Sequence, residues 1–171
     1  MQYTKDSFYL ALRDRLSALN PARTVVVDGV ERPAILVAEN EPATAETPLP
    51  NAYYLHWGAP QIVAGSETAW HPLMKMECRV AYTPGSTLAG DVDRGRAGSE
   101  LDTEVLRLLT PPRTVKVDAT VTPAVPLGTF VFWGTPTFED LPPSAKSGRQ
   151  GGPPQRAAAV TVFFFSEVEQ A

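Results

Sequence analysis

The sequence predicts an α+β protein, in which a mostly antiparallel or mixed β-sheet is flanked by two amphipathic helices and joined by long loops. Strand-like segments come in runs, without regular crossover helices, which favours an antiparallel or mixed sheet over a doubly wound one. Seventeen prolines and twelve glycines divide the chain into short pieces. Residues 73–82, LMKMECRVAY, alternate between two sets of side chains, the pattern of a strand with one face on a core.

Length and composition set the broad limits. A chain of 171 residues is expected to form a single domain over 1–171, with exposed loops at about 39–51 and 142–156. The net charge of −4 argues against a large basic surface for nucleic acid. The N-terminal stretch carries charges inside its apolar part, unlike a signal peptide, and no segment has the length of a membrane span. The default expectation is a cytoplasmic protein.

The first helix is predicted from the repeat of Phe8, Leu12, Leu16 and Leu19 in DSFYLALRDRLSALNP. Asp6 or Ser7 is the expected N-cap, and the Asn20-Pro21 dipeptide is expected to end the helix, because a residue before proline avoids helical angles. One apolar stripe on such a helix indicates that it lies on a sheet.

A hairpin is predicted next, around the Asp28-Gly29 turn. The first strand covers 25–27 and the apolar run resumes at 35–37. Pro33 cannot donate a hydrogen bond to a ladder, so the returning strand is expected to be an edge or bulged strand there. The acidic, proline-rich residues 39–51 that follow read as an exposed loop.

The middle of the chain reads as two strands and a helix. The strands are 52–58, which is aromatic, and 73–82. The second helix has an apolar stripe of Leu101, Val105, Leu108 and Leu109, and Ser99 with Asp102 resembles a capping box at its start. An earlier start near Asp91 would place two glycines inside the helix, at about 1 kcal/mol each relative to alanine.

The C-terminal part reads as three strands, 113–121, 127–134 and the final stretch AAAVTVFFFSEVEQA, with a long flexible loop at 135–157. In the last strand Phe163 and Phe165 are expected to point to one face and Phe164 to the other. Either a second sheet made of the remaining strands or a neighbouring subunit would cover the face that the helices leave open. These three phenylalanines are the first candidates for a subunit interface.

The catalytic candidates are few. His56, His71 and Cys78 would be needed for a small hydrolase or a metal enzyme. Neither histidine has a second ligand at a metal-binding spacing, and Cys78 falls on the apolar face of its strand, where cysteine packs as a small apolar side chain. The sequence therefore predicts neither catalytic residues nor a metal or cofactor, and the protein is expected not to be an enzyme.

Basic side chains offer the remaining candidates. Arg94 and Arg96 precede the second helical stripe and could meet an anion or a partner's carboxylate. The loop SAKSGRQGGPPQR carries Lys146, Arg149 and Arg156 without an acidic residue. It is either a disordered connection or a segment that faces an acidic partner or passing DNA.

The order of these elements is similar to that of the tail terminator or tail completion proteins of long-tailed bacteriophages. The resemblance lies in an N-terminal helix (SFYLALRDRLSAL), an alternating strand (LMKMECRVAY), a second helix (DRGRAGSELDTEVLRLL) and a closing apolar strand (VTVFFFSEVE). It covers most of the chain and matches a pattern of elements, since the family has no signature motif. The proline-rich loop at 39–51 and the basic loop have no counterpart in it.

The resemblance implies a virion structural protein that is assembled in the host cytoplasm. Such a protein forms a ring, commonly a homohexamer, at the head-proximal end of the tail. There it ends polymerisation of the tail tube protein and docks the head–tail connector protein, with DNA passing through. It needs no cofactor. Another head–tail joining or neck protein would have the same sequence features.

Overall fold

The computed structural model describes residues 1–40, 49–85, 90–141 and 155–166, and for residues 90–94 the backbone alone. The helices are α1 (Gln2–Leu19) and α2 (Gly90–Leu108). The strands are β1 (Thr24–Val27), β2 (Val30–Pro33), β3 (Ile35–Val37), β4 (Tyr53–Trp57), β5 (Gln61–Ile62), β6 (Leu73–Tyr82), β7 (Arg113–Asp118), β8 (Val125–Trp133), β9 (Thr137–Leu141) and β10 (Gln155–Phe165).

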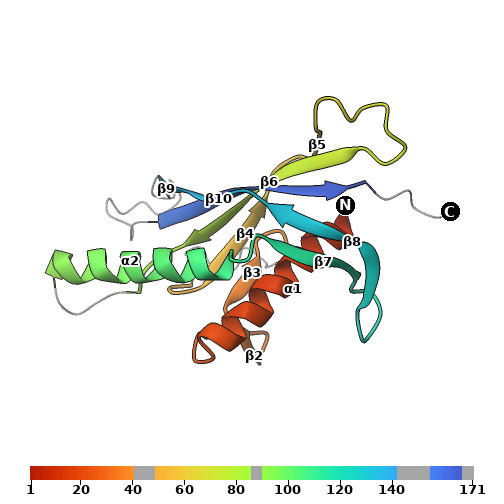
Figure 1. The fold of residues 1–171 in the computed structure, drawn as a ribbon. Helices are drawn as coiled ribbons and strands as arrows, with labels where there is room; N and C mark the ends of the chain where they lie inside the picture. The colour runs from red at the N-terminus through yellow and green to blue at the C-terminus, as the bar shows by residue number, and fades with distance from the viewer. Residues whose placement is uncertain (41–48, 86–89, 142–154, 167–171) are drawn as a thin grey trace.

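The main sheet has the strand order β3-β4-β6-β10-β8-β7, with β5 added beside β6 and β9 beside β10 (Figure 1). β3 runs parallel to β4, and the other neighbours are antiparallel. The longest pairing joins β6 to β10, from Tyr82 opposite Arg156 to Leu73 opposite Phe165. The predicted α+β class, a mixed sheet with two helices, is confirmed.

Both helices lie on the same face of this sheet, which we call the inner face (Figure 1). The ring of Phe8 on α1 meets Trp57 of β4 and Trp133 of β8 edge to face, with centroids 5.3 and 4.9 Å apart. The buried stripe of α2 is Leu101, Val105 and Leu108. The core between the helices and the inner face follows the apolar periodicity of the sequence, because each element hides the face that carries its large apolar side chains.

The start of α1 differs from the prediction. The helix begins at Gln2, so Asp6 and Ser7 lie inside it. Ser7 Oγ donates to the Tyr3 carbonyl at 2.5 Å and accepts the Val117 N–H at 2.9 Å, which ties α1 to β7. A serine inside a helix satisfies its hydroxyl on the preceding turn, so its presence alone does not mark a helix start. The predicted end before Asn20 is confirmed.

The start of α2 also differs. The helix begins at Gly90 and includes Gly95 and Gly98, so Ser99 is not its cap. Ser99 Oγ donates instead to the Gly95 carbonyl at 3.0 Å. Each of these two glycines costs about 1 kcal/mol of helix stability relative to alanine, and burial of the C-terminal half of the helix offsets this cost.

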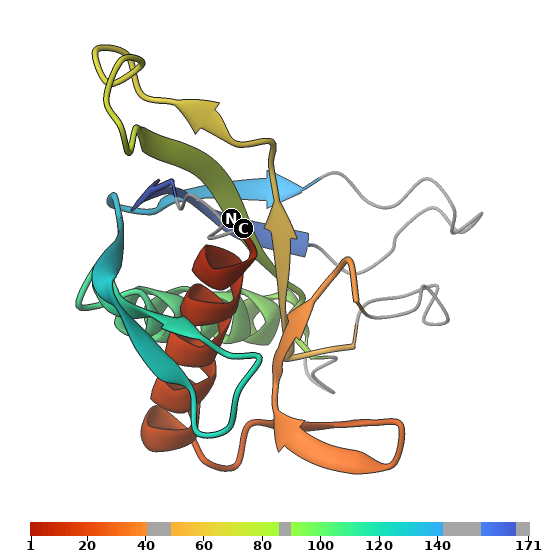
Figure 2. The ribbon, with the colours of Figure 1, turned by 90° about the vertical axis from the view of Figure 1, so that its right-hand side faces the viewer.

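The predicted hairpin forms, but with a different second strand. Asp28 and Gly29 both have positive φ angles, 51° and 78°, as a two-residue type I′ turn requires. The turn returns the chain as β2, which ends at Pro33, and 35–37 is a separate strand beside β4. Pro33 ends the ladder because it has no N–H to donate. Figure 2 shows the β1–β2 hairpin extending from the lower end of the molecule.

The predicted loop at 135–157 is wrong at both ends. It contains β9, which pairs with the first half of β10. β10 itself begins at Gln155, so the predicted exposed loop at 142–156 overlaps the strand. The alternation of Phe138 with its polar neighbours was the available signal for β9. In the described ranges, no helix has the length and hydropathy needed to cross a membrane.

Candidate interaction surface

The three C-terminal phenylalanines divide between the two faces of the sheet, as predicted. Phe164 is fully buried on the inner face, together with Val160 and Val162. Phe163 is half-buried and Phe165 is 44% exposed on the opposite face, which we call the outer face. β10 lies in the middle of the sheet, so its apolar outer face cannot be explained as the frayed edge of the fold.

Neighbouring strand β8 continues this apolar outer surface. Phe132 lies opposite Phe163 in the register, and their rings stack with centroids 5.4 Å apart and planes 12° apart. Phe132 is 37% exposed and Phe130, two residues earlier, is 52% exposed. Phe130, Phe132, Phe163 and Phe165 form what we call the aromatic patch. The two phenylalanines of β8 are not among the candidates predicted from the sequence, although the alternation in FVFW is a sufficient signal.

The aromatic patch has a cation at each side. Across the strands, Arg113 of β7 lies opposite Phe132, and Lys75 of β6 lies opposite Phe163. The row Arg113–Phe132–Phe163–Lys75 therefore crosses four adjacent strands, a span of about 14 Å at ~4.8 Å per strand. Among the described residues, neither cation has an ion pair or a side-chain hydrogen bond.

The rest of the outer face is charged and already paired. Arg79 Nε lies 2.8 Å from Glu77 and 3.2 Å from Glu139, and all three side chains are about half exposed. Such exposed ion pairs contribute about 0–1 kcal/mol each. Among the described residues, the most exposed large apolar side chains of the outer face lie on β8 and β10 and on the adjoining part of β7, where Val115 is 42% exposed.

The aromatic patch is uncovered within the described part of the chain, since both helices lie on the inner face and β1 and β2 form a separate hairpin. The alternative of a second sheet as its cover is therefore not realised there. Its exposed ring area is on the order of 200–300 Å², given that a whole phenylalanine offers roughly 150–250 Å². The largest apolar patch of a typical monomer is about 300–600 Å² and is often functional, so this patch reaches the lower end of that range.

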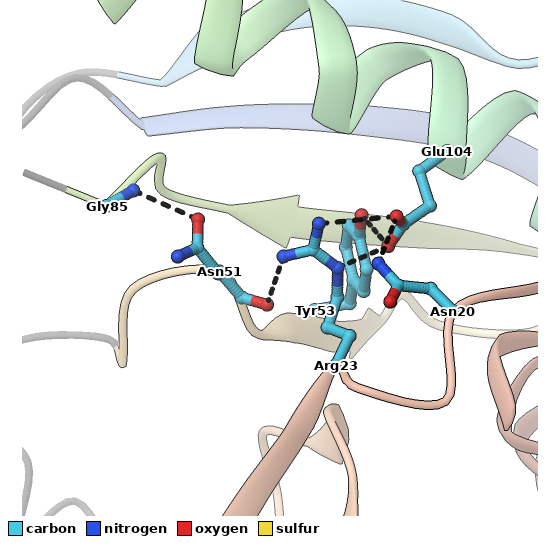
Figure 3. Close-up of polar contacts among 6 residues, drawn as sticks. All are labelled: Asn20, Arg23, Asn51, Tyr53, Gly85 and Glu104. Carbon is cyan, nitrogen blue, oxygen red and sulfur yellow. Dashed lines mark hydrogen bonds and ion pairs between the residues drawn. The ribbon is translucent and has the colours of Figure 1, made fainter. Parts of the chain in front are cut away.

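Polar contacts hold α2 against the inner face, at the end of the β6–β10 ladder opposite to the patch. Figure 3 shows Glu104 of α2 at their centre. Its carboxylate lies 2.5 Å from Arg23 Nε and accepts hydrogen bonds from Asn20 Nδ2 at 3.0 Å and Tyr53 OH at 2.8 Å. Arg23 also donates to the Asn51 carbonyl at 3.4 Å, and the Asn51 side chain accepts the Gly85 N–H at 3.0 Å.

A second tyrosine makes a parallel contact. Tyr82 lies opposite Tyr53 on the adjacent strand, with ring centroids 5.7 Å apart, and its hydroxyl donates to Asp102 of α2. Burial, together with the neighbouring carboxylate, raises the pKa of each tyrosine above its ordinary value. The two hydroxyls therefore stay protonated and remain donors to α2 at neutral pH.

Arg156 belongs to this contact and not to a free basic loop, which corrects the sequence-based interpretation. It lies in β10, and its guanidinium is 2.8 Å from Asp102 and 3.3 Å from Asp140 of β9. Lys146 and Arg149, the other basic candidates, lie outside the described residues. Arg94 lies in α2, within the part described by its backbone alone, and Arg96 is exposed on a shallow groove between α2 and the end of α1.

The three catalytic candidates are not brought together. Cys78 is fully buried on the inner face, and its burial raises the pKa of its thiol well above the ordinary value. His56 is on the outer face, where burial and then the charge of Arg79 lower its pKa. His71 is exposed in the connection between β5 and β6, with Nδ1 3.3 Å from the Ser166 carbonyl oxygen. Among the described residues, no three histidine, cysteine or acidic side chains are grouped as metal ligands.

Comparison with known proteins adds no assignment. The chain matches no protein-family model, and no curated protein matches it significantly in sequence.

Proposed function

We propose that this protein is a structural component of a phage virion, which forms a ring at the head-proximal end of the tail, ends tube polymerisation and docks the head connector. The observation that carries the proposal is the aromatic patch on the outer face of β8 and β10. A monomer gains nothing from exposing this much aromatic surface in the centre of a sheet, whereas burial in an assembly stabilises it by about 25 cal/mol per Å².

The physical requirements of a ring are consistent with this surface. Rings form through heterologous interfaces, in which one patch of a subunit meets a different patch of the next. The patch is smaller than the roughly 800 Å² per partner of a standard stable interface, so the polar residues around it would form the rim. A net charge of −4 per chain also suits a collar through which DNA passes without adhering.

The test is the assembly state of the full chain, measured by native mass spectrometry and by light scattering, alone and mixed with tail tube protein. The proposal predicts a closed oligomer, commonly of six subunits, in at least one of these conditions. A chain that stays monomeric and binds neither tube nor connector subunits would contradict it.

If the protein is instead another head–tail joining protein, it would also assemble, but it would occupy a different layer of the neck. Labelling the protein in intact virions and imaging them by electron microscopy separates the two positions. A label at the tail's head-proximal ring supports the terminator role, and a label in a different layer of the neck replaces it with the joining role.

A further inference from the structure

The two cations that border the aromatic patch restrict which partner surfaces can bind to it. In the row Arg113–Phe132–Phe163–Lys75 the stacked rings are apolar, and the cation at each end has no ion-pair partner among the described residues. A surface that fits this row has an apolar centre and carboxylates beside it, because a buried or half-buried cation needs a counter-charge.

A twofold dimer that packs one row against another does not meet this requirement. With the twofold axis along the row, Arg113 faces its own copy. With the axis across the row, Arg113 faces Lys75. Either alignment brings cation against cation, which costs free energy and is a common device against wrong partners. The charges therefore disfavour an aligned, isologous contact.

The β1–β2 hairpin offers the complementary surface. Val26 and Val30 are 65% and 63% exposed, the largest exposures of aliphatic side chains recorded in the described part of the chain. Asp28 occupies the turn between them, and Glu31, also exposed, lies opposite Val26 in the register. Val26 and Glu31 share one face of the hairpin, whereas Val30 lies opposite Val27 on the other face. With Asp28 in the turn, the Val26 face thus combines one exposed apolar side chain with two carboxylates, and the hairpin extends away from the main sheet (Figure 2).

We infer that the aromatic patch of one copy receives the β1–β2 hairpin tip of a second copy. Val26 covers the rings of Phe132 and Phe163, and the carboxylates of Glu31, on the same face of the hairpin, and of Asp28 in the turn pair with Arg113 and Lys75. The contact joins two different patches, so it is heterologous and can be repeated from copy to copy into a ring. This inference rests on the proposed self-assembly and names the surfaces that carry it.

Two variants, each with only one of the two contact surfaces altered, test the inference. The patch variant is Phe132→Ser with Phe163→Ser, and the hairpin variant is Val26→Ser with Glu31→Gln, the two residues that share the contact face. Leu106→Ser is the matched control, since Leu106 is 43% exposed on α2, away from both surfaces. Sedimentation velocity measures the assembly of each variant alone and of the two mixed in equal amounts.

The expected result is that each double variant fails to assemble on its own, with at least ~30-fold weaker association, the loss typical of an interface hot spot. The mixture gives a dimer that grows no further, because it contains one intact patch facing one intact hairpin. The control assembles like wild type. Circular dichroism and thermal melting confirm that the variants fold, and the charge variant Arg113→Glu with Lys75→Glu, which leaves the rings in place, is expected to lose assembly as well.

The outcomes distinguish failure of the hairpin contact from failure of the proposed function. If wild type assembles and the hairpin variant assembles equally well, the hairpin is not the occupant and the inference is overturned, while the proposed function stands. If the hairpin variant assembles and the patch variant does not, the patch contacts another partner surface or its own copy. If wild type remains monomeric alone and with tube protein, the proposed function fails together with the inference.

Discussion

Phe164 and Phe165 are adjacent residues of the same strand, and replacing each by alanine is expected to destabilise the fold to very different extents. Phe164 is fully buried against the core, whereas Phe165 is 44% exposed on the outer face. Removing a buried phenylalanine side chain costs about 3–5 kcal/mol, from lost burial and the cavity that remains. The same change at Phe165 removes about half as much contact and leaves no enclosed cavity, so we expect a loss of about 1 kcal/mol.

Urea unfolding of dilute protein, at a concentration where the chain is monomeric, measures these free energies. A loss of 3–5 kcal/mol is a large part of the ~5–15 kcal/mol that stabilises a typical domain. In a chain of this size it lowers Tm by roughly 6–20 °C, at ~2–4 °C per kcal/mol. At higher concentration Phe165→Ala should instead weaken assembly. Equal loss of unfolding free energy in the two variants, or a larger loss at Phe165, would refute the assignment of the two faces.

The contacts of α2 and the buried thiol give three further predictions. Glu104→Gln removes the counter-charge of Arg23, whose side chain is 19% exposed, and should lower the free energy of unfolding by about 2–4 kcal/mol in urea titrations; a loss below about 0.5 kcal/mol would contradict the role of this pair. The pKa values of Tyr53 and Tyr82 are raised in the folded state, so their contribution to stability is complete below the ordinary tyrosine pKa and is lost as pH rises through the folded-state values. Tyr53→Phe should therefore make the free energy of unfolding less sensitive to alkali than in wild type. An unchanged dependence of the free energy of unfolding on alkaline pH would speak against this. Cys78 should react with a thiol reagent at pH 8 only in urea, at the rate of unfolding, and fast labelling of native protein would show that its burial is wrong.

Periodicity was enough to predict the parts of the fold that have one buried face. The alternation in β6 and β10 and the helical repeats of Phe8 and Leu101 follow from burial of one side of each element, which a sequence displays directly. The two faces of the last strand were likewise predictable, because successive side chains of a strand point in opposite directions.

What the sequence did not reveal depends on contacts between distant residues. The sequence predicts a start of α2 at Ser99 because two glycines disfavour a helix, yet packing of its C-terminal half outweighs that local preference. The sequence predicts a loop where β9 forms, because a short strand among prolines has little signal until β10 pairs with it. Arg156 looked like part of a free basic loop, since its partners Asp102 and Asp140 come from other elements.

The aromatic patch was likewise only partly predictable from the sequence. Phe163 and Phe165 could be named from the last strand alone, but the patch became visible only when β8 placed Phe132 beside Phe163. Its two flanking cations come from β7 and β6, and only the register of four strands brings them into one row.

The central claim is that copies of this chain meet through the outer face of β8 and β10. A cryo-electron microscopy map of the wild-type assembly tests it most directly. The account predicts that the rings of Phe130, Phe132, Phe163 and Phe165 lie at a boundary between subunits and are covered there. A closed assembly in which these rings remain on the solvent-facing surface, with the contacts made elsewhere, would contradict it.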